Sequence, residues 1–519
     1  MSKTAKAAAW IMIATMLSKV LGFFREQIFA NFYGTGAYAD IFVLTLNIPG
    51  LIIAIIGSAV ATTYIPLYVE TREEHGQEKA LKFTNNVLNL CYVLAIVIAI
   101  LGLVFTEQFV TVFAAGFVGK PDKFHDAVIF TKIMISGVLF ISGSKILGSY
   151  LQVNDSFTVP SLIGLPYNII IITATVISGV TKNIYILPVG ALIAMASQLF
   201  FQIPFAKKKA YKYQPYIDIK DESIQRLGIL VMPMLLGVSV GQINIYVDRL
   251  LATTLLDGRL AALNYASKLN DFVLALFVTS IITVIYPKLA KLTNDDNEEG
   301  FISTIVKSSN CVILVVLPIS VGFIILAEPI VRILFERGEF NATSTELTTI
   351  ALQLFSLGLL ACGIRDVLYR VFYSMTDTKT PMINSSIALT INIVLNLILI
   401  KPLGHAGLAL STSISSIITA GLLFFSLKKK KGHFGGSRIV KTGLKSLIAS
   451  LIMGAVAWFI YKELAIVLGT GLIKEILAVS AASVSGAILY LILITLMKVE
   501  EIELVFDIVK KGKNKLLRR

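Results

Sequence analysis

Polar residues in this chain are confined to short segments that separate long apolar runs. Each run has about 20 residues or more, the length that a helix needs to cross the hydrocarbon of a bilayer. Backbone groups in lipid must be hydrogen-bonded within their own segment, so these runs are predicted to be helices rather than strands. The pattern predicts fourteen spans, at residues 7–31, 38–68, 86–114, 127–151, 159–179, 184–206, 224–255, 260–287, 303–326, 345–373, 381–400, 405–427, 442–461 and 475–497.

Basic residues alternate from one side of the predicted membrane to the other. About 30 Lys and Arg residues lie in the two terminal segments and in the loops on one side, whereas nine lie on the other side. Lys and Arg gather in cytoplasmic loops, so both termini are expected in the cytoplasm. Leaving out one span would break the alternation, which favours an even number of spans.

A repeat is visible at an interval of 221 residues. Three landmarks recur at that interval: Pro66 with Pro287, Pro160 with Pro381, and Lys207 with Lys428. The repeat pairs spans 1–6 with spans 7–12, and both halves have the same orientation because six is even. Parallel repeats of this kind occur in transporters that rock two lobes about a site at the bilayer midplane. Duplication without a transport role is the alternative.

Four parts of the chain follow from the spans and the repeat. Residues 1–210 are expected to form an N-terminal lobe and residues 211–431 a C-terminal lobe. Residues 432–497 would add a pair of helices. Residues 498–519 carry apolar and basic positions at helical spacing, which predicts an amphipathic cytoplasmic tail lying on anionic lipid.

Composition agrees with a membrane protein and argues against other classes. The 519 residues are 56% hydrophobic and 15% charged, whereas soluble domains have about 25% charged residues. The net charge of +14 would suit nucleic acid, but no loop is long enough to form a nucleic-acid-binding domain. Cys91, Cys311 and Cys362 lie in apolar runs without metal-ligand spacing, so no cofactor is expected from them.

Charged residues inside predicted spans are the best candidates for function. A charge at the bilayer centre costs roughly 2.5–3.5 kcal/mol, so it usually faces protein or a water-filled cavity. Lys19 and Arg25 lie in span 1 with Gly22 between them, and Lys268 supplies a cation in the second half. Cations around a central cavity suit a phosphate-bearing substrate, because Arg offers bidentate hydrogen bonds and Lys a point charge. An exporter of cationic drugs would need carboxylates there instead.

Three stretches of the sequence are distinctive: SKVLGFFREQIFANFYGTGAYADIFVLTLNIPGL at 18–51, FYSMTDTKTP at 372–381 and LNLILIKPLGHAGLALSTSIS at 395–415. They resemble the MurJ/MviN family of lipid II flippases, in the MOP exporter superfamily. The resemblance implies an all-α, V-shaped molecule of two six-helix lobes around a cationic cavity. It also implies that spans 13 and 14 line a groove for a lipid tail.

Particular positions match the family's functional residues. The resemblance assigns substrate-binding roles to six of them: Lys19, Arg25, Glu26, Asp40, Asn168 and Lys268. It also suggests a sodium site that involves Asp248 and Asp377. The alternative for Asp377 is a turn residue ahead of Pro381.

The predicted function is a non-enzymatic flippase for lipid II in a bacterial plasma membrane, working by alternating access and coupled to sodium or to the membrane potential. Expected partners are lipid II, membrane lipids and cell-wall synthesis enzymes, without nucleic acid. Three alternatives remain: a flippase for another polyprenyl-diphosphate oligosaccharide, a MATE-like exporter, and a membrane glycosyltransferase. The last of these needs external catalytic carboxylates, and the segment 327–344 offers Glu328, Glu336 and Glu339 beside two arginines.

Overall fold

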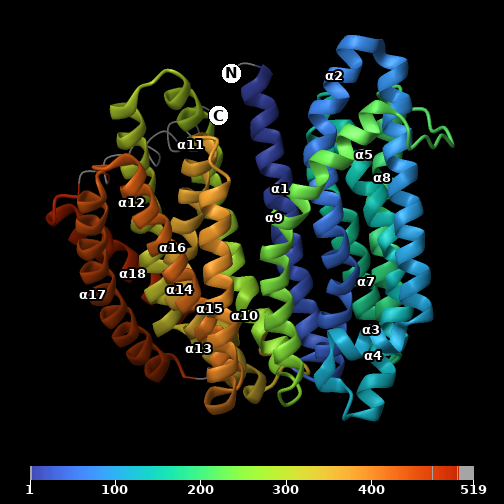
Figure 1. Ribbon diagram of the computed structural model, residues 1–519. Coiled ribbons are helices and arrows are strands. Elements are labelled where there is room, and N and C mark those ends of the chain that lie inside the picture. The colour runs from blue at the N-terminus through green and yellow to red at the C-terminus, as the bar shows by residue number, and fades with distance from the viewer. Residues whose placement is uncertain (1–2, 470, 500, 502–519) are drawn as a thin grey trace. The chain divides into compact units, whose positions relative to one another are not determined.

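The computed structural model describes residues 3–469, 471–499 and 501, and these residues form helices joined by short connections (Figure 1). No strand occurs among them. The helices are α1 (Lys3–Tyr33), α2 (Ala37–Val104), α3 (Thr106–Phe113), the 3-10 turn η1 (Ala115–Phe117), α4 (Pro121–Ile135), α5 (Gly137–Val153), α6 (Thr158–Leu162), α7 (Gly164–Thr181), α8 (Ile186–Lys208), α9 (Glu222–Thr253), α10 (Arg259–Val273), the π-helical turn η2 (Leu274–Val278), α11 (Thr279–Asn294), α12 (Glu298–Ile325), α13 (Ala327–Phe335), α14 (Ala342–Ser374), α15 (Lys379–Leu403), α16 (His405–Lys431), α17 (Gly436–Leu468) and α18 (Leu472–Leu496).

Each predicted span coincides with a helix or with consecutive helices. Within the described residues, eleven helical stretches are long and apolar enough to cross a membrane, and Ala37–Leu51 is a shorter apolar stretch. The all-α, multi-pass class is therefore confirmed. The amphipathic tail falls outside the described residues from residue 502 onward.

Spans 2 and 3 form one long hairpin, which is a difference from the prediction. Helical geometry continues through α2 except at Gly76, where φ is 82° and ψ is 173°. The polar segment around Gly76 is rich in Glu, Lys and Gln, which favour helix, so the helices continue beyond the apolar residues. The left-handed φ at Gly76 reverses the chain at the tip, where glycine adopts this geometry without strain.

Two compact units divide the chain, and each has its own core. The first comprises Met1–Ala261 and Arg337–Asn341, and the second comprises Ala262–Glu336 and Ala342–Arg519. Tyr64, Tyr68 and Tyr150 lie fully buried in a core cluster of the first unit. Val312 and Phe372 lie in a core cluster of the second. The lobes predicted from the repeat, 1–210 and 211–431, remain a prediction, since these units are defined by contacts alone.

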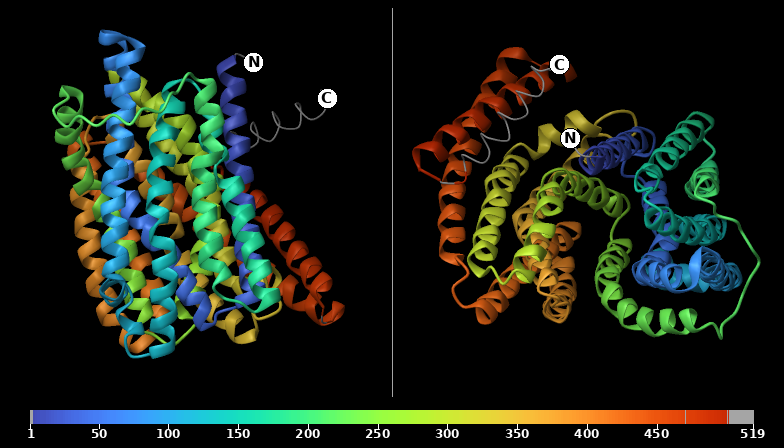
Figure 2. Two further views of the ribbon diagram at one scale, coloured as in Figure 1. Left: turned by 90° about the vertical axis from the view of Figure 1, so that its right-hand side faces the viewer. Right: turned by 90° about the horizontal axis from the view of Figure 1, so that it is seen from above.

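The connection between α8 and α9 is extended rather than helical. Residues 209–221, called the linker below, run along the outer side of the first unit, as the view from above shows (Figure 2). The linker ends where Asp221 caps α9, with its carboxylate accepting hydrogen bonds from the N–H groups of Ser223 and Ile224.

Candidate functional site

Arg25 lies on the face of α1 that packs against α7. The Arg25 Nη1 atom donates a hydrogen bond to Asn168 Oδ1 at 3.2 Å. The Asn168 Nδ2 atom donates in turn to the backbone carbonyl of Ser18 at 3.3 Å. Gly22 lies between the two contacts, and a Cβ there would stand 3.6 Å from the Asn168 amide. One buried amide thus joins two turns of α1 to α7.

The Arg25 guanidinium is held from two further sides. It forms an ion pair with the neighbouring Glu26, and its Cζ lies 5.8 Å from the centre of the Tyr167 ring. The Arg25 side chain is 16% exposed and that of Glu26 is 8% exposed. These contacts fix the orientation of the guanidinium and leave some of its five N–H donors for an anionic ligand.

Lys19 does not join this cluster. Its side chain is exposed, and it forms no hydrogen bond or ion pair with the residues that the structure describes. The structure therefore brings Arg25, Glu26 and Asn168 together and leaves Lys19 on a separate, exposed side of α1.

Asp40 lies in the first turn of α2 and contacts the first turn of α10. Its Oδ2 atom accepts a hydrogen bond from the backbone N–H of Gly258 at 2.8 Å, and its Oδ1 atom accepts one from Ala261 at 2.9 Å. Both residues belong to the first unit. The carboxylate thus caps a helix N-terminus, where unpaired N–H groups and the helix dipole favour negative charge.

The contact between Asp40 and Ala261 spans 221 residues, the interval of the sequence repeat. Corresponding positions of the two halves therefore meet at this point. The contact is one-sided, because Ala261 has no polar side chain with which to return it.

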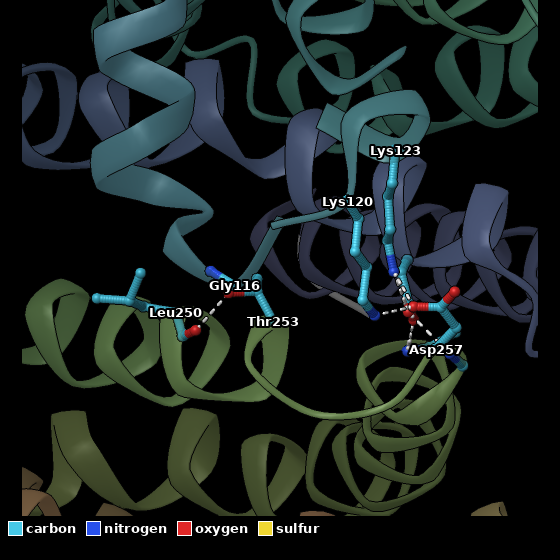
Figure 3. A network of polar contacts seen from close by, with 9 residues as sticks. Gly116, Lys120, Lys123, Leu250, Thr253 and Asp257 are labelled. Carbon is cyan, nitrogen blue, oxygen red and sulfur yellow. Dashed lines mark hydrogen bonds and ion pairs between the residues drawn. The ribbon is translucent and has the colours of Figure 1, made fainter. Parts of the chain in front are cut away.

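Lys123 completes the Asp40 cluster, and the sequence analysis did not single it out. Its Nζ lies 2.9 Å from Asp40 Oδ2 and 3.0 Å from Asp257 Oδ1, and Lys120 reaches the same Asp257 oxygen at 2.6 Å (Figure 3). The Lys123 side chain is 6% exposed, and its ammonium stands 4.3 Å from the centre of the Phe117 ring. Span prediction placed Lys123 in an external loop, and only the fold brings it to Asp40.

Asp257 is the exposed member of the cluster. Partial burial raises its pKa, but the hydrogen bonds from Lys120 and Lys123 outweigh this effect and hold the pKa below its ordinary value. Beside it, Gly116 donates its N–H to Thr253 Oγ1 at 3.1 Å (Figure 3). A Cβ at Gly116 would meet the Thr253 carbonyl oxygen at 2.1 Å, so only glycine allows this close backbone approach.

Lys268 lies on α10 in the second unit. Its Nζ is 3.9 Å from Asp271 Oδ2, and the two side chains are 37% and 64% exposed. A long, exposed pair of this kind contributes little to stability. Because Lys268 and Arg25 belong to different units, the shared cationic cavity remains a prediction.

Asp377 has the geometry of a turn residue. Its carboxylate accepts hydrogen bonds from the Thr380 N–H at 3.0 Å, the Thr380 hydroxyl at 2.6 Å and Lys430 Nζ at 2.5 Å. Burial raises the pKa of Asp377, but these bonds from Lys430 and Thr380 bring it down to about 2. An ammonium group already holds the oxygen that a sodium ion would need.

Asp248 is the second residue of the suggested sodium site. Asp248 is half-buried on α9, in the first unit. Among the described residues, no group of three or more His, Cys, Asp or Glu side chains could hold a metal ion. The sodium site at Asp248 and Asp377 remains a prediction.

An apolar groove of about 400 Å³ lies in the second unit. Helices α12, α17 and α18 form its walls, with residues such as Leu314, Gly322, Met453 and Ile494. Gly454 lets α17 approach α12 closely, because a Cβ there would meet Ile325 Cδ1 at 2.3 Å. Helices α17 and α18 correspond to spans 13 and 14, for which the family resemblance implies a lipid-tail groove.

Comparison with known proteins defines the class to which this fold belongs. A solved structure described as "Lipid II flippase MurJ, inward closed conformation" superimposes with a TM-score of 0.80 at 29% identity, covering 94% of this chain and 98% of that one. An inward-facing multidrug resistance MATE family transporter of the MOP superfamily matches with a TM-score of 0.65 and 14% identity, covering 83% of this chain and 99% of that one. The fold is that of a MOP-type membrane transporter.

The family follows from sequence. The model described as lipid II flippase MurJ matches residues 29–498. The probable lipid II flippase MurJ of Haemophilus influenzae is 30% identical over 468 residues, covering 87% of this chain and 91% of the relative. That of Vibrio cholerae is 29% identical over 505 residues, covering 95% and 96%. The chain belongs to the lipid II flippase MurJ family.

Proposed function

We propose that this protein flips lipid II, the lipid-linked precursor of peptidoglycan, across the bacterial plasma membrane without acting as an enzyme. Membership of the MurJ family and the MOP-type fold support the proposal. The observation that carries it is the semi-buried Arg25, fixed between Glu26, Asn168 and Tyr167 on α1, the helix that coincides with predicted span 1. A cation kept there at an energetic cost is best explained by an anionic substrate.

Each candidate residue has a role in this proposal. Arg25 binds the diphosphate, whereas Lys19 and Lys268 stay predicted substrate-binding residues that lie outside the Arg25 cluster. Glu26 and Asn168 orient the Arg25 guanidinium. Asp40 acts by fixing the start of α10, so its role is in positioning rather than in substrate contact.

The lipid tail has a candidate site of its own. The apolar groove between α12, α17 and α18 has a volume of about 400 Å³ and an almost wholly hydrophobic lining, which suits an isoprenoid chain. Keeping the tail in lipid leaves only the polar headgroup to be carried across, which is the costly part of the transfer.

Both termini are proposed to lie in the cytoplasm, with the headgroup entering from that side. Outward movement of an anion is favoured by a potential that is negative inside, by about 2.3 kcal/mol per charge per 100 mV. Cell-wall synthesis enzymes are the proposed partners on the outer side.

The test is rescue of a bacterium depleted of its lipid II flippase. Wild type should restore growth, and Arg25→Ala should fail at equal membrane abundance. Arg226→Ala is the matched control, because it removes an exposed arginine that forms an ion pair with Glu70, and it should rescue. Failure of well-expressed wild type would point to another polyprenyl-diphosphate substrate. Rescue by Arg25→Ala would refute the role of the cation.

A further inference from the structure

The linker is fastened to the first unit by three asparagines of α2. Asn85 Nδ2 donates to the Lys212 carbonyl at 2.9 Å, and Asn89 Nδ2 donates to the carbonyls of Gln214 and Tyr216 at 2.9 and 3.0 Å. Asn86 makes a reciprocal pair, donating to the Asp218 carbonyl at 2.7 Å and accepting from the Asp218 N–H at 2.9 Å. The asparagine side chains thus satisfy backbone groups of the linker that, in a β-strand, would bond to a neighbouring strand.

Two tyrosines of the linker complete the attachment. The Tyr211 hydroxyl donates to Asn85 Oδ1 at 2.9 Å, and the Tyr213 hydroxyl donates to Asn89 Oδ1 at 3.0 Å. These hydrogen bonds hold the linker in place against α2. The space between the linker and the helices is therefore a defined part of the first unit.

A groove of about 460 Å³ lies between the linker and α2, α5 and α8. Its lining includes Val93, Ile96, Phe140, Leu199, Tyr213 and Ile217. Val93 and Ile96 are about half exposed, so the groove opens on the side of α2 that faces lipid. Its volume lies within the range of small-ligand sites.

Lysines are frequent on the chain next to the groove residues, and Lys212 directly precedes Tyr213, which lines the groove. Five lysines at the end of α8 and along the linker are exposed: Lys207, Lys208, Lys209, Lys212 and Lys220. None forms an ion pair with any residue in the described ranges.

The acidic groups nearby accept hydrogen bonds from backbone N–H groups and, at Asp218, from the Tyr216 hydroxyl. Asp218 accepts from the Lys220 N–H, and Asp221 caps α9. Neither Asp218 nor Asp221 forms an ion pair with these lysines, and Tyr211, Tyr213 and Tyr216 supply the aromatic residues typical of a membrane interface.

We propose that this groove binds an anionic glycerophospholipid, with an acyl chain between α2, α5 and α8 and the phosphate at Lys208, Lys209 and Lys212. An apolar slot that is open to lipid, with exposed lysines on the adjoining linker and at the end of α8, matches a ligand with one apolar chain and one anionic head. The bound lipid would hold the linker against the first unit at the membrane surface. The site is independent of the proposed function, since all its residues lie outside the candidate substrate site.

The experiment uses full-length protein in phosphatidylcholine nanodiscs containing phosphatidylglycerol with a photoreactive diazirine in one acyl chain. Mass spectrometry should find labelling concentrated on the segments that carry Val93, Phe140 and Leu199. Excess unlabelled phosphatidylglycerol should suppress the labelling, whereas phosphatidylethanolamine and inorganic phosphate should not.

Two variants test separately the binding of the lipid headgroup and the binding of its acyl chain. K208Q combined with K209Q should weaken phosphatidylglycerol labelling roughly tenfold, because each basic residue near a surface contributes to anionic lipid binding. K428Q with K429Q is the matched control at the end of α16 and should change nothing. Ile96→Trp should fill the groove and abolish labelling there without lowering the Tm.

Three outcomes would overturn the proposal. Equal labelling of all lipid-facing helices, unaffected by the lysine changes, would mean ordinary annular lipid. Competition by inorganic phosphate would indicate a site for a soluble anion. An equal loss in the α16 control would reduce the effect to overall charge.

Discussion

Asp40 shows how much one side chain organises in this protein. Its two oxygens accept from two backbone N–H groups of the α10 start and from the buried Lys123 ammonium. Removing the charge would leave Lys123 with only the exposed Asp257 as its counter-ion. A buried cation without its main partner is strongly unfavourable.

We therefore expect Asp40→Asn to lower the free energy of unfolding by about 3 kcal/mol. The amide can still accept one backbone hydrogen bond, so the loss would come mainly from the ion pair. Thermal unfolding of the purified protein in detergent measures it.

Asp257→Asn is the control for that experiment, because the Asp257 side chain is 45% exposed. Its effect should be well under half of that at position 40, since exposed ion pairs contribute about 0–1 kcal/mol. An equal loss of free energy of unfolding in the two variants would show that the buried Asp40–Lys123 ion pair stabilises the fold no more than the exposed Asp257 pair does.

For single residues, the sequence could predict which side chains are functional candidates but not which side chains they contact in the fold. Arg25 stood out because a charge inside an apolar run requires an explanation. Lys123 gave no such signal, because a lysine in a loop near a membrane surface is ordinary. Its burial depends on Asp40, which lies 83 residues away in the chain.

At the scale of helices, the packing of α12, α17 and α18 leaves one glycine facing open space. A Cβ at Gly322 would have no atom within 4 Å, although the residue lines the groove. A larger side chain there would enter the groove without a steric clash. Position 322 therefore allows the groove to be filled while the helices stay in place.

We expect Gly322→Leu to reduce rescue of a flippase-depleted strain several-fold and leave the fold intact. Replacing a helical glycine should itself stabilise α12 by roughly 0.5–1 kcal/mol. The measurement pairs growth rescue with the Tm of the purified variant.

Gly421→Leu on α16 serves as the control, because a Cβ at Gly421 also meets nothing within 4 Å and this glycine lies away from the groove. It should rescue fully. Full rescue by both variants would remove the groove from the transport mechanism.

Apolar patterning predicted where helices cross the membrane better than where they end. In α2 the polar segment around Gly76 continues the helix because its residues favour that conformation. The path of the linker could not be predicted either, since it depends on hydrogen bonds from Asn85, Asn86 and Asn89 rather than on the linker's own residues.

For the whole molecule, composition and periodicity were sufficient for the class. Long apolar runs allow only helices in lipid, so the all-α, multi-pass fold followed from elementary physics. The family came from the motifs, and sequence matching along 29–498 confirmed it.

The candidate site was less accessible to prediction. Arg25 and Asn168 do meet, at 3.2 Å, but Lys19 lies on the exposed side of the same helix. The six-residue spacing already places the two basic side chains about 120° apart around α1, but it does not show which of them meets α7. The contacts of a side chain depend on which helices pack against its own, and that packing is determined by residues throughout the chain.

The hairpin tip at Gly76 has a consequence for how the chain could be assembled. The first arm of α2, residues 37–75, is roughly 58 Å long at 1.5 Å per residue, so it extends beyond a hydrocarbon layer of about 30 Å. The tip is exposed, and nothing lies within 4 Å of a Cβ at Gly76. A protease site inserted after Gly76 should be cut in inverted vesicles but not in intact spheroplasts; cutting in spheroplasts would reverse the proposed sidedness.

Because each arm has its own packing in the first unit, the two fragments should remain associated, and co-expressed halves should reconstitute a working protein.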